Sequence, residues 1–140
     1  MAEHNRIGQL GEQLAADLLK RKGYKILATN WKFRHLEIDI IAATKKEIAF
    51  VEVKTRTSTF GGRPENAVNA TKKRRLAAAA KAYLSYNNES RNPRFDVVSI
   101  LLNPNGEIEE IQHFEKAFQS QPTYRAITSF LGKWRWFSRD

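Results

Sequence analysis

Two apolar runs joined by a short polar segment constrain the fold of this chain more than any other feature. The runs cover about residues 36–43 and 47–55, and the sequence TKKE lies between them. Such runs, rich in β-branched residues and bounded by a few polar ones, predict an antiparallel β-hairpin. If the turn is centred between Lys45 and Lys46, the pairing of the two strands is fixed residue by residue.

The predicted hairpin gathers polar side chains where a core strand would carry valine or isoleucine. Its register places Asp39 opposite Glu52 and Glu37 opposite Lys54. Side chains two residues apart share one face of a strand, so all four are expected in one patch. Two carboxylates directly across a ladder repel each other unless a cation or a shared proton lies between them. The spacing therefore predicts a divalent cation, and oxygen ligands favour Mg²⁺ or Mn²⁺.

Lys54 beside such a cation would have a definable task. It could stabilise charge on a phosphate or position the attacking water, while the metal acidifies that water. This chemistry is phosphodiester hydrolysis. The alternative, of about equal weight from spacing alone, is an ordinary solvated surface with Glu37 and Lys54 as a cross-strand ion pair. Ile41 and Phe50, expected on the same face, count against that alternative, whereas Leu36, Ile38 and Ile40 are expected on the opposite face.

The rest of the chain predicts a single α/β domain. Residues 5–22 are expected to form an amphipathic helix, and residues 24–33 a strand before the hairpin. A second helix is expected with Thr71 as its N-cap, followed by a buried strand in RFDVVSILL, a turn at NPNG and an edge strand in EIEEIQHF. The order is α-β-β-β-α-β with one further strand. The apolar stripe of the first helix consists of Ile7, Leu10, Leu14 and Leu18.

Composition limits the classes of partner and compartment. The 140 residues, 41% of them hydrophobic, fit one core, and a formal net charge of +9 favours a polyanionic partner such as nucleic acid or an acidic membrane surface. The absence of cysteine excludes disulfides and cysteine-ligated zinc. The first residues lack the apolar segment of a secretion signal, and no window of 18 residues is apolar enough to span a membrane, so a cytoplasmic protein is expected.

Glu12 of the first helix could contribute a further acid. It does not lie on the leucine stripe, and its neighbours at helical spacing are Gly8, Ala15, Ala16 and Leu19. A face of small residues lets a helix approach a sheet closely. Glu12 could then lean toward the carboxylate patch, although an exposed helix glutamate is the slightly favoured alternative.

The second helix begins with a run of basic residues. Lys72 and Arg75 lie on the same side as Leu76 and are expected to point inward, whereas Lys73 and Arg74 point elsewhere. Free amides and the dipole at a helix N-terminus favour anions, so Lys72 and Arg75 could complete a phosphate site there. The alternative is a solvated basic run.

The histidines and the last acid of interest have structural interpretations. The three histidines are too scattered for a zinc site. His35 alternates with Glu37 and Asp39, but a hydrogen-bonded structural histidine is the favoured interpretation. Asp96 is expected to end or buttress its strand.

The order of these features resembles a known nuclease superfamily. An acid on the first helix, Asp39 on one strand, Glu52-Val53-Lys54 on the next and a helix after it are similar to the PD-(D/E)xK pattern, whose core is the α-β-β-β-α-β restriction-endonuclease-like fold. More closely, the blocks GQLGEQLAADLLKRKGYKILATNW, LEIDIIA, IAFVEVKTRT, FGGRPENAV and KKRRLAAAAKAYL resemble the YraN family of small bacterial proteins, which are relatives of archaeal Holliday-junction resolvases. The blocks lie in the right order over most of the chain.

The resemblance implies roles for individual residues. Asp39 and Glu52 match metal ligands, with the Val53 carbonyl oxygen as a candidate third, for Mg²⁺ or Mn²⁺. Lys54 matches the catalytic lysine, and Glu12 matches an acid that helps to hold metal or water.

The resemblance also implies a substrate and a surface that binds it. The expected function is a metal-dependent endonuclease acting on structured or branched DNA, as a homodimer because a four-way junction needs two symmetric cuts. The candidate nucleic-acid contacts are Arg56, Lys72, Lys73, Arg74 and Arg75. Leu36 stands where the family usually has glycine, so close backbone approach by DNA is not implied there.

Two segments of different composition are expected. Residues 1–120 would form the resolvase-like nuclease domain, and residues 121–140 a C-terminal extension with four basic and five aromatic residues after Gln121. The extension could stack on bases or meet a membrane surface, but aromatic packing on its own domain is favoured. Two alternatives to the nuclease are a nucleic-acid-binding module without catalysis and a scaffold that contacts a partner through this extension.

Overall fold

The computed structural model of the chain describes residues 2–57 and 69–118, with side chains from residue 6 onward. Neither helix in these ranges is long and apolar enough to cross a membrane. Residues 58–68 and 119–140, which include the predicted extension at 121–140, lie outside the described residues. The elements are α1 (Ala2–Arg21), β1 (Lys25–Phe33), β2 (Leu36–Ala43), β3 (Glu47–Thr57), α2 (Ala70–Tyr86), β4 (Asn92–Leu102) and β5 (Ile108–Phe118).

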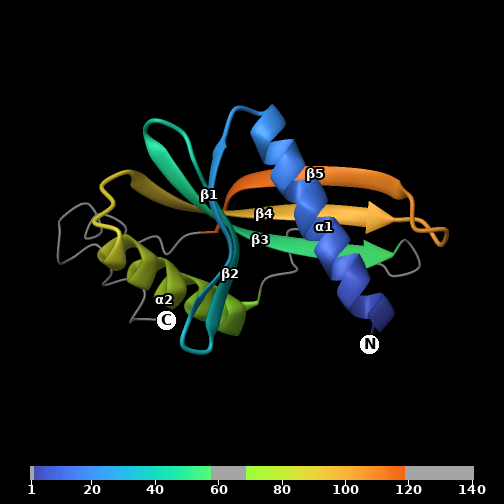
Figure 1. The fold of residues 1–140 in the computed structure, drawn as a ribbon, viewed down its shortest axis with the longest axis horizontal. Coiled ribbons are helices and arrows are strands. Elements are labelled where there is room, and N and C mark those ends of the chain that lie inside the picture. Colours follow the sequence, from blue (N-terminus) through green and yellow to red (C-terminus); the bar gives the residue numbers. More distant parts are fainter. Residues whose placement is uncertain (1, 58–68, 119–140) are drawn as a thin grey trace.

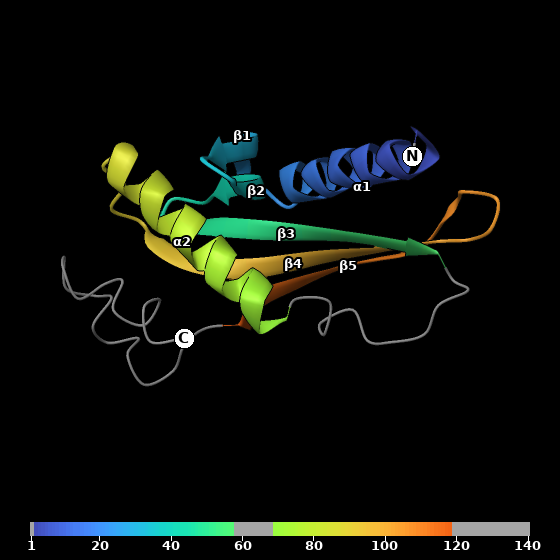
Figure 2. The same ribbon diagram turned by 90° about the horizontal axis from the view of Figure 1, so that it is seen from below.

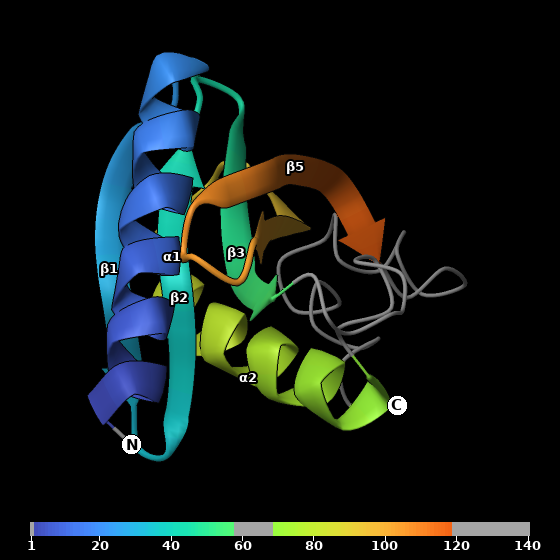
Figure 3. The ribbon, with the colours of Figure 1, turned by 90° about the vertical axis from the view of Figure 1, so that its right-hand side faces the viewer.

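The five strands form one mixed sheet in the order β1-β2-β3-β4-β5 (Figure 1). Only β3 and β4 pair in parallel, and α2 is the crossover between them. The other described pairs are antiparallel. The helices cover opposite faces of the sheet (Figure 2), and β1 and β5 form its two edges (Figure 3). The predicted order α-β-β-β-α-β with one further strand is confirmed, and it is consistent with a restriction-endonuclease-like core.

The hairpin of β2 and β3 has the predicted register. Ile41 lies opposite Phe50, and the paired residues extend to Ile40 opposite Val51. Beyond this pair the β1–β2 hairpin turns across the direction of β3, β4 and β5 (Figure 1). The strands therefore diverge where Asp39 and Glu52 face each other.

The two faces of the sheet carry separate hydrophobic clusters. Beneath α2 the cluster includes Ile41, Phe50 and Tyr83, and beneath α1 it includes Ile40 and Val51. The expectation that three residues of β2 share the face away from Phe50 was wrong for two of them, because strand twist breaks simple alternation along this hairpin. The two that pack on the α2 side are Leu36 and Ile38.

The predicted leucine stripe is not the buried centre of α1. Leu10 is 43% exposed, whereas Ala15 and Leu19 are fully buried. The contact with the sheet is made by the small-residue face, which allows the helix axis to lie close to β3. The bulkier residues flank this contact and pack at its margin, namely Ile7, Leu14 and Leu18.

The N-cap of α2 lies two residues earlier than predicted. Asn69 has an extended backbone, and its Oδ1 accepts a hydrogen bond from the Lys72 amide at 2.9 Å. Thr71 lies within the first turn, where its hydroxyl accepts from Arg74. Asparagine caps a helix as well as threonine does, so composition alone did not distinguish the two positions.

Candidate active site

A cleft of about 350 Å³ lies between the start of β2, the middle of β3 and the N-terminal turns of α2. Five residues predicted for the site meet here, three of them acidic and two basic: Glu37, Asp39, Glu52, Lys72 and Arg75. Asp39 and Glu52 line the same cleft, as the hairpin register predicted. The other described residues that line it are His35, Leu36, Asn69, Thr71 and Leu76.

Asp39 occupies the point where the two strands separate. Its Oδ2 accepts a hydrogen bond from the Val53 amide at 2.8 Å, so a side chain takes over a position in the strand ladder. This contact holds the carboxylate beside Glu52 rather than letting it turn to solvent. The aspartate, which lines the cleft, is therefore oriented by a backbone contact through one of its two oxygens.

The electrostatic environment of Asp39 opposes its ionisation. Burial and the neighbouring carboxylate of Glu52 raise the pKa of Asp39 to about 7, although the Val53 amide acts in the opposite direction. Glu12 and Glu37 add smaller repulsions. The mutual repulsion of facing acids, inferred from spacing, is present in the folded protein.

We expect Asp39→Asn to stabilise the metal-free protein at pH 8 by about 2 kcal/mol. Because the pKa of Asp39 is about 7 in the fold against 3.8 for the free side chain, the folded state binds more protons between these values. The contribution of Asp39 to the stability of the fold is fully present below pH 4, where its carboxyl is protonated in both states, and is lost as the pH rises through 7. Urea unfolding at pH 4 and pH 8 measures this change.

Asp17→Asn is the matched control, because Asp17 is on α1 and accepts an exposed hydrogen bond from Gln13. It should change stability little at either pH. A gain in Asp39→Asn that is the same at pH 4 and pH 8 would contradict the assignment of the penalty to ionisation.

Glu52 is buried and paired with the first turn of α2. Its side chain is 8% exposed, and its Oε2 lies 2.8 Å from the Nζ of Lys72. This hydrogen-bonded ion pair raises the pKa of Lys72, more than burial lowers it. The carboxylate that faces Asp39 is therefore neutralised by a lysine from another element.

Glu12 approaches the carboxylates from α1. Burial raises its pKa, a hydrogen bond with the Asn30 side chain lowers it, and repulsion from Glu37 and Glu52 raises it further. Glu12 is thus within electrostatic reach of the acids, although it is not among the residues that line the cleft. Sequence reasoning missed Asn30, whose positive φ of 50° in a strand is a conformation that asparagine adopts more readily than most residues.

The remaining predicted residues of β3 extend beyond the cleft. Lys54 and Arg56 follow Glu52 at intervals of two and are partly buried, and neither is a lining residue. Val53 packs on the α1 side of the sheet. Lys54 shares the face of β3 with Glu52 through strand alternation, and its role at the site stays a prediction.

The basic run of α2 divides as expected. Lys72 and Arg75 line the cleft, whereas the Nζ of Lys73 lies 5.3 Å from the centre of the Phe118 ring. Arg74 bonds to Thr71 within its own helix turn. The roles of these four residues in binding nucleic acid stay predictions. His35 was expected to be a structural histidine, and this was wrong, because it is exposed and lines the cleft.

The donor set suits a hard cation that needs few protein ligands. Asp39 and Glu52 supply carboxylate oxygens, and the Val53 carbonyl is the candidate third donor. Within residues 2–57 and 69–118, no group of three or more His, Asp or Glu side chains is arranged to hold a metal ion. Mg²⁺ commonly accepts one or two carboxylates and retains water, so two acids fit Mg²⁺ or Mn²⁺ better than Ca²⁺ or Zn²⁺.

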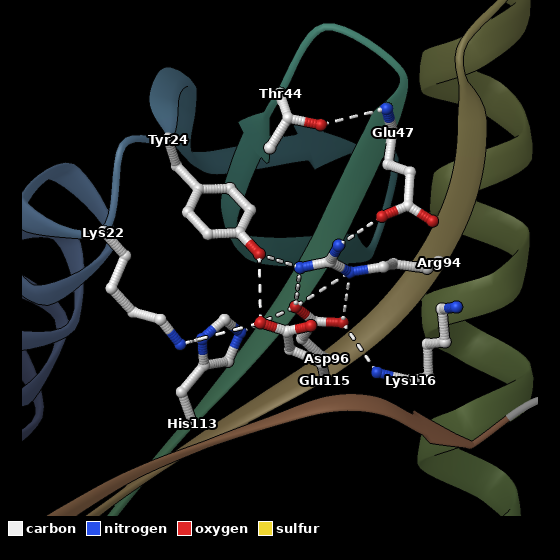
Figure 4. Close-up of polar contacts among 9 residues, drawn as sticks. All are labelled: Lys22, Tyr24, Thr44, Glu47, Arg94, Asp96, His113, Glu115 and Lys116. Atoms are coloured by element: carbon white, nitrogen blue, oxygen red, sulfur yellow. Dashed lines mark hydrogen bonds and ion pairs between the residues drawn. The ribbon is translucent and has the colours of Figure 1, made fainter.

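A second polar cluster lies on the α1 side of the sheet (Figure 4). Arg94 contacts Glu47 at 2.6 Å, Asp96 at 2.9 Å and the hydroxyl of Tyr24. The Nε2 of His113 lies 2.7 Å from the Oδ2 of Asp96. Asp96 is fully buried, which confirms its predicted buttressing role. The sequence signal for this cluster is the spacing of Arg94 and Asp96, two apart in an apolar strand, and a role is predicted from the sequence for Asp96 alone.

The comparison with known proteins identifies the family. The family described as "Uncharacterised protein family UPF0102" matches residues 11–100, from α1 to β4. The chain belongs to the UPF0102 family. This confirms the resemblance to YraN proteins, which are the same family, and the matched region includes Glu12, Asp39, Glu52 and Lys54.

Relatives in the UPF0102 family match this chain over nearly their full length. A UPF0102 protein of Porphyromonas gingivalis is 42% identical over 118 residues, which are 84% of this chain and 87% of the relative. One from Flavobacterium johnsoniae is 43% identical over 122 residues, covering 84% of this chain and 98% of the relative. One from Caldanaerobacter subterraneus is 43% identical over 114 residues, covering 80% and 93%.

Proposed function

We propose that this UPF0102 protein is a metal-dependent endonuclease that hydrolyses phosphodiester bonds in structured or branched DNA. The observation that supports this most directly is the cleft in which Asp39 and Glu52 face each other beside the N-terminus of α2. Paired carboxylates suit a hard cation, and the helix end with Lys72 and Arg75 suits a phosphate. The net charge of +9 favours a nucleic acid over a small phosphate ester.

In the proposed reaction each residue has a limited task. Asp39 and Glu52, with the Val53 carbonyl, would hold Mg²⁺ or Mn²⁺, which when bound acidifies water and polarises the phosphorus centre. Lys54 would stabilise the negative charge that develops on the phosphate. Glu12, from the other face of the sheet, would help to orient the water that attacks.

The phosphate backbone would be bound by groups at the start of α2. Arg75 and residues of the first turn of α2 line the cleft, and that turn contains no acid to oppose an anion. Arg56, Lys73 and Arg74 would extend this contact along the DNA on either side. Two copies of the chain would be needed for symmetric cuts in a four-way junction.

Cleavage of a four-way junction in Mg²⁺ or Mn²⁺ tests the proposal. We expect Asp39→Ala and Lys54→Ala to reduce the rate by at least about a hundredfold, because each removes a group that acts on the developing charge. Junction binding, measured by fluorescence anisotropy, should persist in both variants. A linear duplex of the same sequence is the substrate control.

Lys81→Ala is the matched control for the lysine change, since Lys81 is exposed on α2 and does not line the cleft. It should cleave at the wild-type rate. Cleavage that survives both Asp39→Ala and Lys54→Ala would identify a contaminating nuclease and remove the support for this function.

A nucleic-acid-binding module without catalysis is the second candidate. It is favoured by the placement of Lys54 outside the lining of the cleft and by the ion pair that already neutralises Glu52. On this hypothesis junction affinity should fall steeply with salt concentration, and no metal-dependent products should form.

A further inference from the structure

The ion pair between Lys72 and Glu52 joins a residue proposed to bind phosphate to a residue proposed to bind the metal ion. The Nζ of Lys72 lies 2.8 Å from the Oε2 of Glu52, with side chains 49% and 8% exposed. Glu52 is a proposed ligand of the metal, and Lys72 lies at the end of α2 that would bind phosphate. One cation from the chain thus contacts the acid that a metal ion would need.

An ammonium group and a divalent cation compete for the same carboxylate. Both would lie within a few ångströms of Glu52, where partial burial weakens solvent screening of their mutual repulsion. The Oδ2 of Asp39 is already bonded to the Val53 amide, so one of the four carboxylate oxygens in the cleft is in use. Entry of the metal is therefore favoured when the Nζ of Lys72 leaves Glu52.

Lys72 can leave without a change in the fold. Its backbone is fixed, since its amide donates to the Oδ1 of Asn69 at 2.9 Å. Its side chain is half exposed and has a flexible four-carbon stem, so the ammonium group can change position while α2 stays in place. Arg75 and the N-terminus of α2 line the same cleft, so an anion bound there would be a new partner for the displaced ammonium of Lys72.

We propose that Lys72 is an exchangeable counterion, which neutralises Glu52 in the free protein and transfers to a DNA phosphate when the metal enters. The inference rests on the proposed function and adds a coupling to it. Lys72 weakens metal binding in the absence of DNA, and DNA strengthens it by drawing the ammonium away. The site then acquires its cation together with its substrate, and by linkage the metal strengthens DNA binding equally.

Calorimetric titration of the DNA-free protein with Mn²⁺ at pH 7.5 tests the first half. We expect Lys72→Gln to bind Mn²⁺ about tenfold more tightly than the wild type, because the competing charge is gone. Lys81→Gln is the matched control, since Lys81 is exposed on α2 and does not line the cleft, and it should leave the affinity unchanged. Arg75→Gln removes a charge from the cleft lining, and its gain should be clearly smaller.

Each other result has a defined meaning. If the wild type takes up Mn²⁺ and Asp39→Asn abolishes the uptake, but Lys72→Gln binds no more tightly than the wild type, the inference is wrong and the metal site stands. An equal gain in Lys72→Gln and Arg75→Gln would also overturn it, because general cleft charge would then be the cause. No uptake of Mn²⁺ by any variant would overturn both the metal site and the inference.

The coupling to DNA is tested in a background that cannot cleave. Mn²⁺ affinity is measured for Lys54→Ala and for Lys54→Ala combined with Lys72→Gln, each with and without a saturating four-way junction. Junction DNA should raise the affinity about tenfold in the first protein and much less in the second. An equal gain in both proteins would overturn the exchange.

Discussion

Asp96→Asn is expected to lower the free energy of unfolding by about 3–5 kcal/mol, the largest effect of any single change in charge described for this chain. Asp96 is fully buried and accepts hydrogen bonds from Arg94, His113 and the Lys116 amide. The substitution leaves the guanidinium of Arg94 buried without its main counterion. Chemical denaturation at pH 7 measures the loss.

The pH dependence distinguishes this loss from one due to packing. Burial raises the pKa of Asp96, but hydrogen bonds from His113 and Arg94 outweigh it, and the net pKa lies below 3.8. A depressed pKa contributes stability above pH 4 that is lost as pH falls through the folded value. The difference between Asp96→Asn and the wild type should therefore shrink in strongly acidic solution. A difference that is constant with pH would point to packing instead.

Two further proteins control for the substitution itself. Asp17→Asn makes the same chemical change at a position that is only partly buried and whose hydrogen bond is exposed, and it should cost less than about 0.5 kcal/mol. Arg94→Gln combined with Asp96→Asn removes both charges and should recover part of the loss, because no buried charge remains unpaired. If the double variant loses more free energy of unfolding than the sum of the two single losses, the unpaired charge of Arg94 is not the cause of the loss in Asp96→Asn.

The tautomer of His113 follows from the same cluster. Its Nδ1 lies 2.6 Å from the Nζ of Lys22, which can only donate, so Nδ1 accepts and Nε2 donates to Asp96. The contacts of Lys22 and Tyr24 with this cluster tie the end of α1 to β4 and β5 (Figure 4). Asp96 therefore supports the helix that presents Glu12.

The fold and the facing acids could be predicted because they depend on local periodicity. Apolar alternation and the TKKE turn determined the pairing of Ile41 with Phe50, and with it the meeting of Asp39 and Glu52. The inward direction of Lys72 followed from its spacing to Leu76 on one helix face. Each of these depends on neighbours within one hairpin or one helix.

Features that join distant segments could not be predicted in this way. The ion pair of Lys72 with Glu52 depends on how α2 docks on the sheet. The contact of Arg94 with Tyr24 joins residues 70 apart in sequence. The departure of Ile38 from alternation depends on the twist of a whole hairpin, which no short window of sequence specifies.

The buried face of α1 is another feature that hydrophobicity alone did not predict. Hydrophobicity favoured Leu10 as the contact residue, yet the helix uses its smallest residues there. A Cβ atom on Gly11 would lie 1.9 Å from the Oγ1 of Thr55 and 3.1 Å from its Cβ. Thr55 is adjacent to Lys54 on β3, so Gly11 determines how closely α1 approaches the strand of the candidate site.

Gly11→Ala is expected to destabilise the protein by about 2–3 kcal/mol, because overpacking at this contact exceeds the gain in helix propensity. Gly8→Ala is the matched control, since a Cβ there meets nothing within 4 Å, and it should stabilise by about 0.5–1 kcal/mol. The same chemical change three residues apart in one helix thus has opposite expected signs. Thermal and urea unfolding of both variants measure them.

A double variant tests whether Thr55 is the cause. Thr55→Ala removes the hydroxyl that a Cβ on Gly11 would meet at 1.9 Å, so Gly11→Ala should cost less than about 1 kcal/mol in that background. Because Glu12 follows Gly11 on the helix, a forced shift of α1 should also move this acid relative to Asp39 and Glu52. Weaker Mn²⁺ binding by Gly11→Ala, restored in the double variant, would tie this close contact to the site. If Gly11→Ala is as destabilising without the Thr55 hydroxyl as with it, the helix is held at its distance by other contacts.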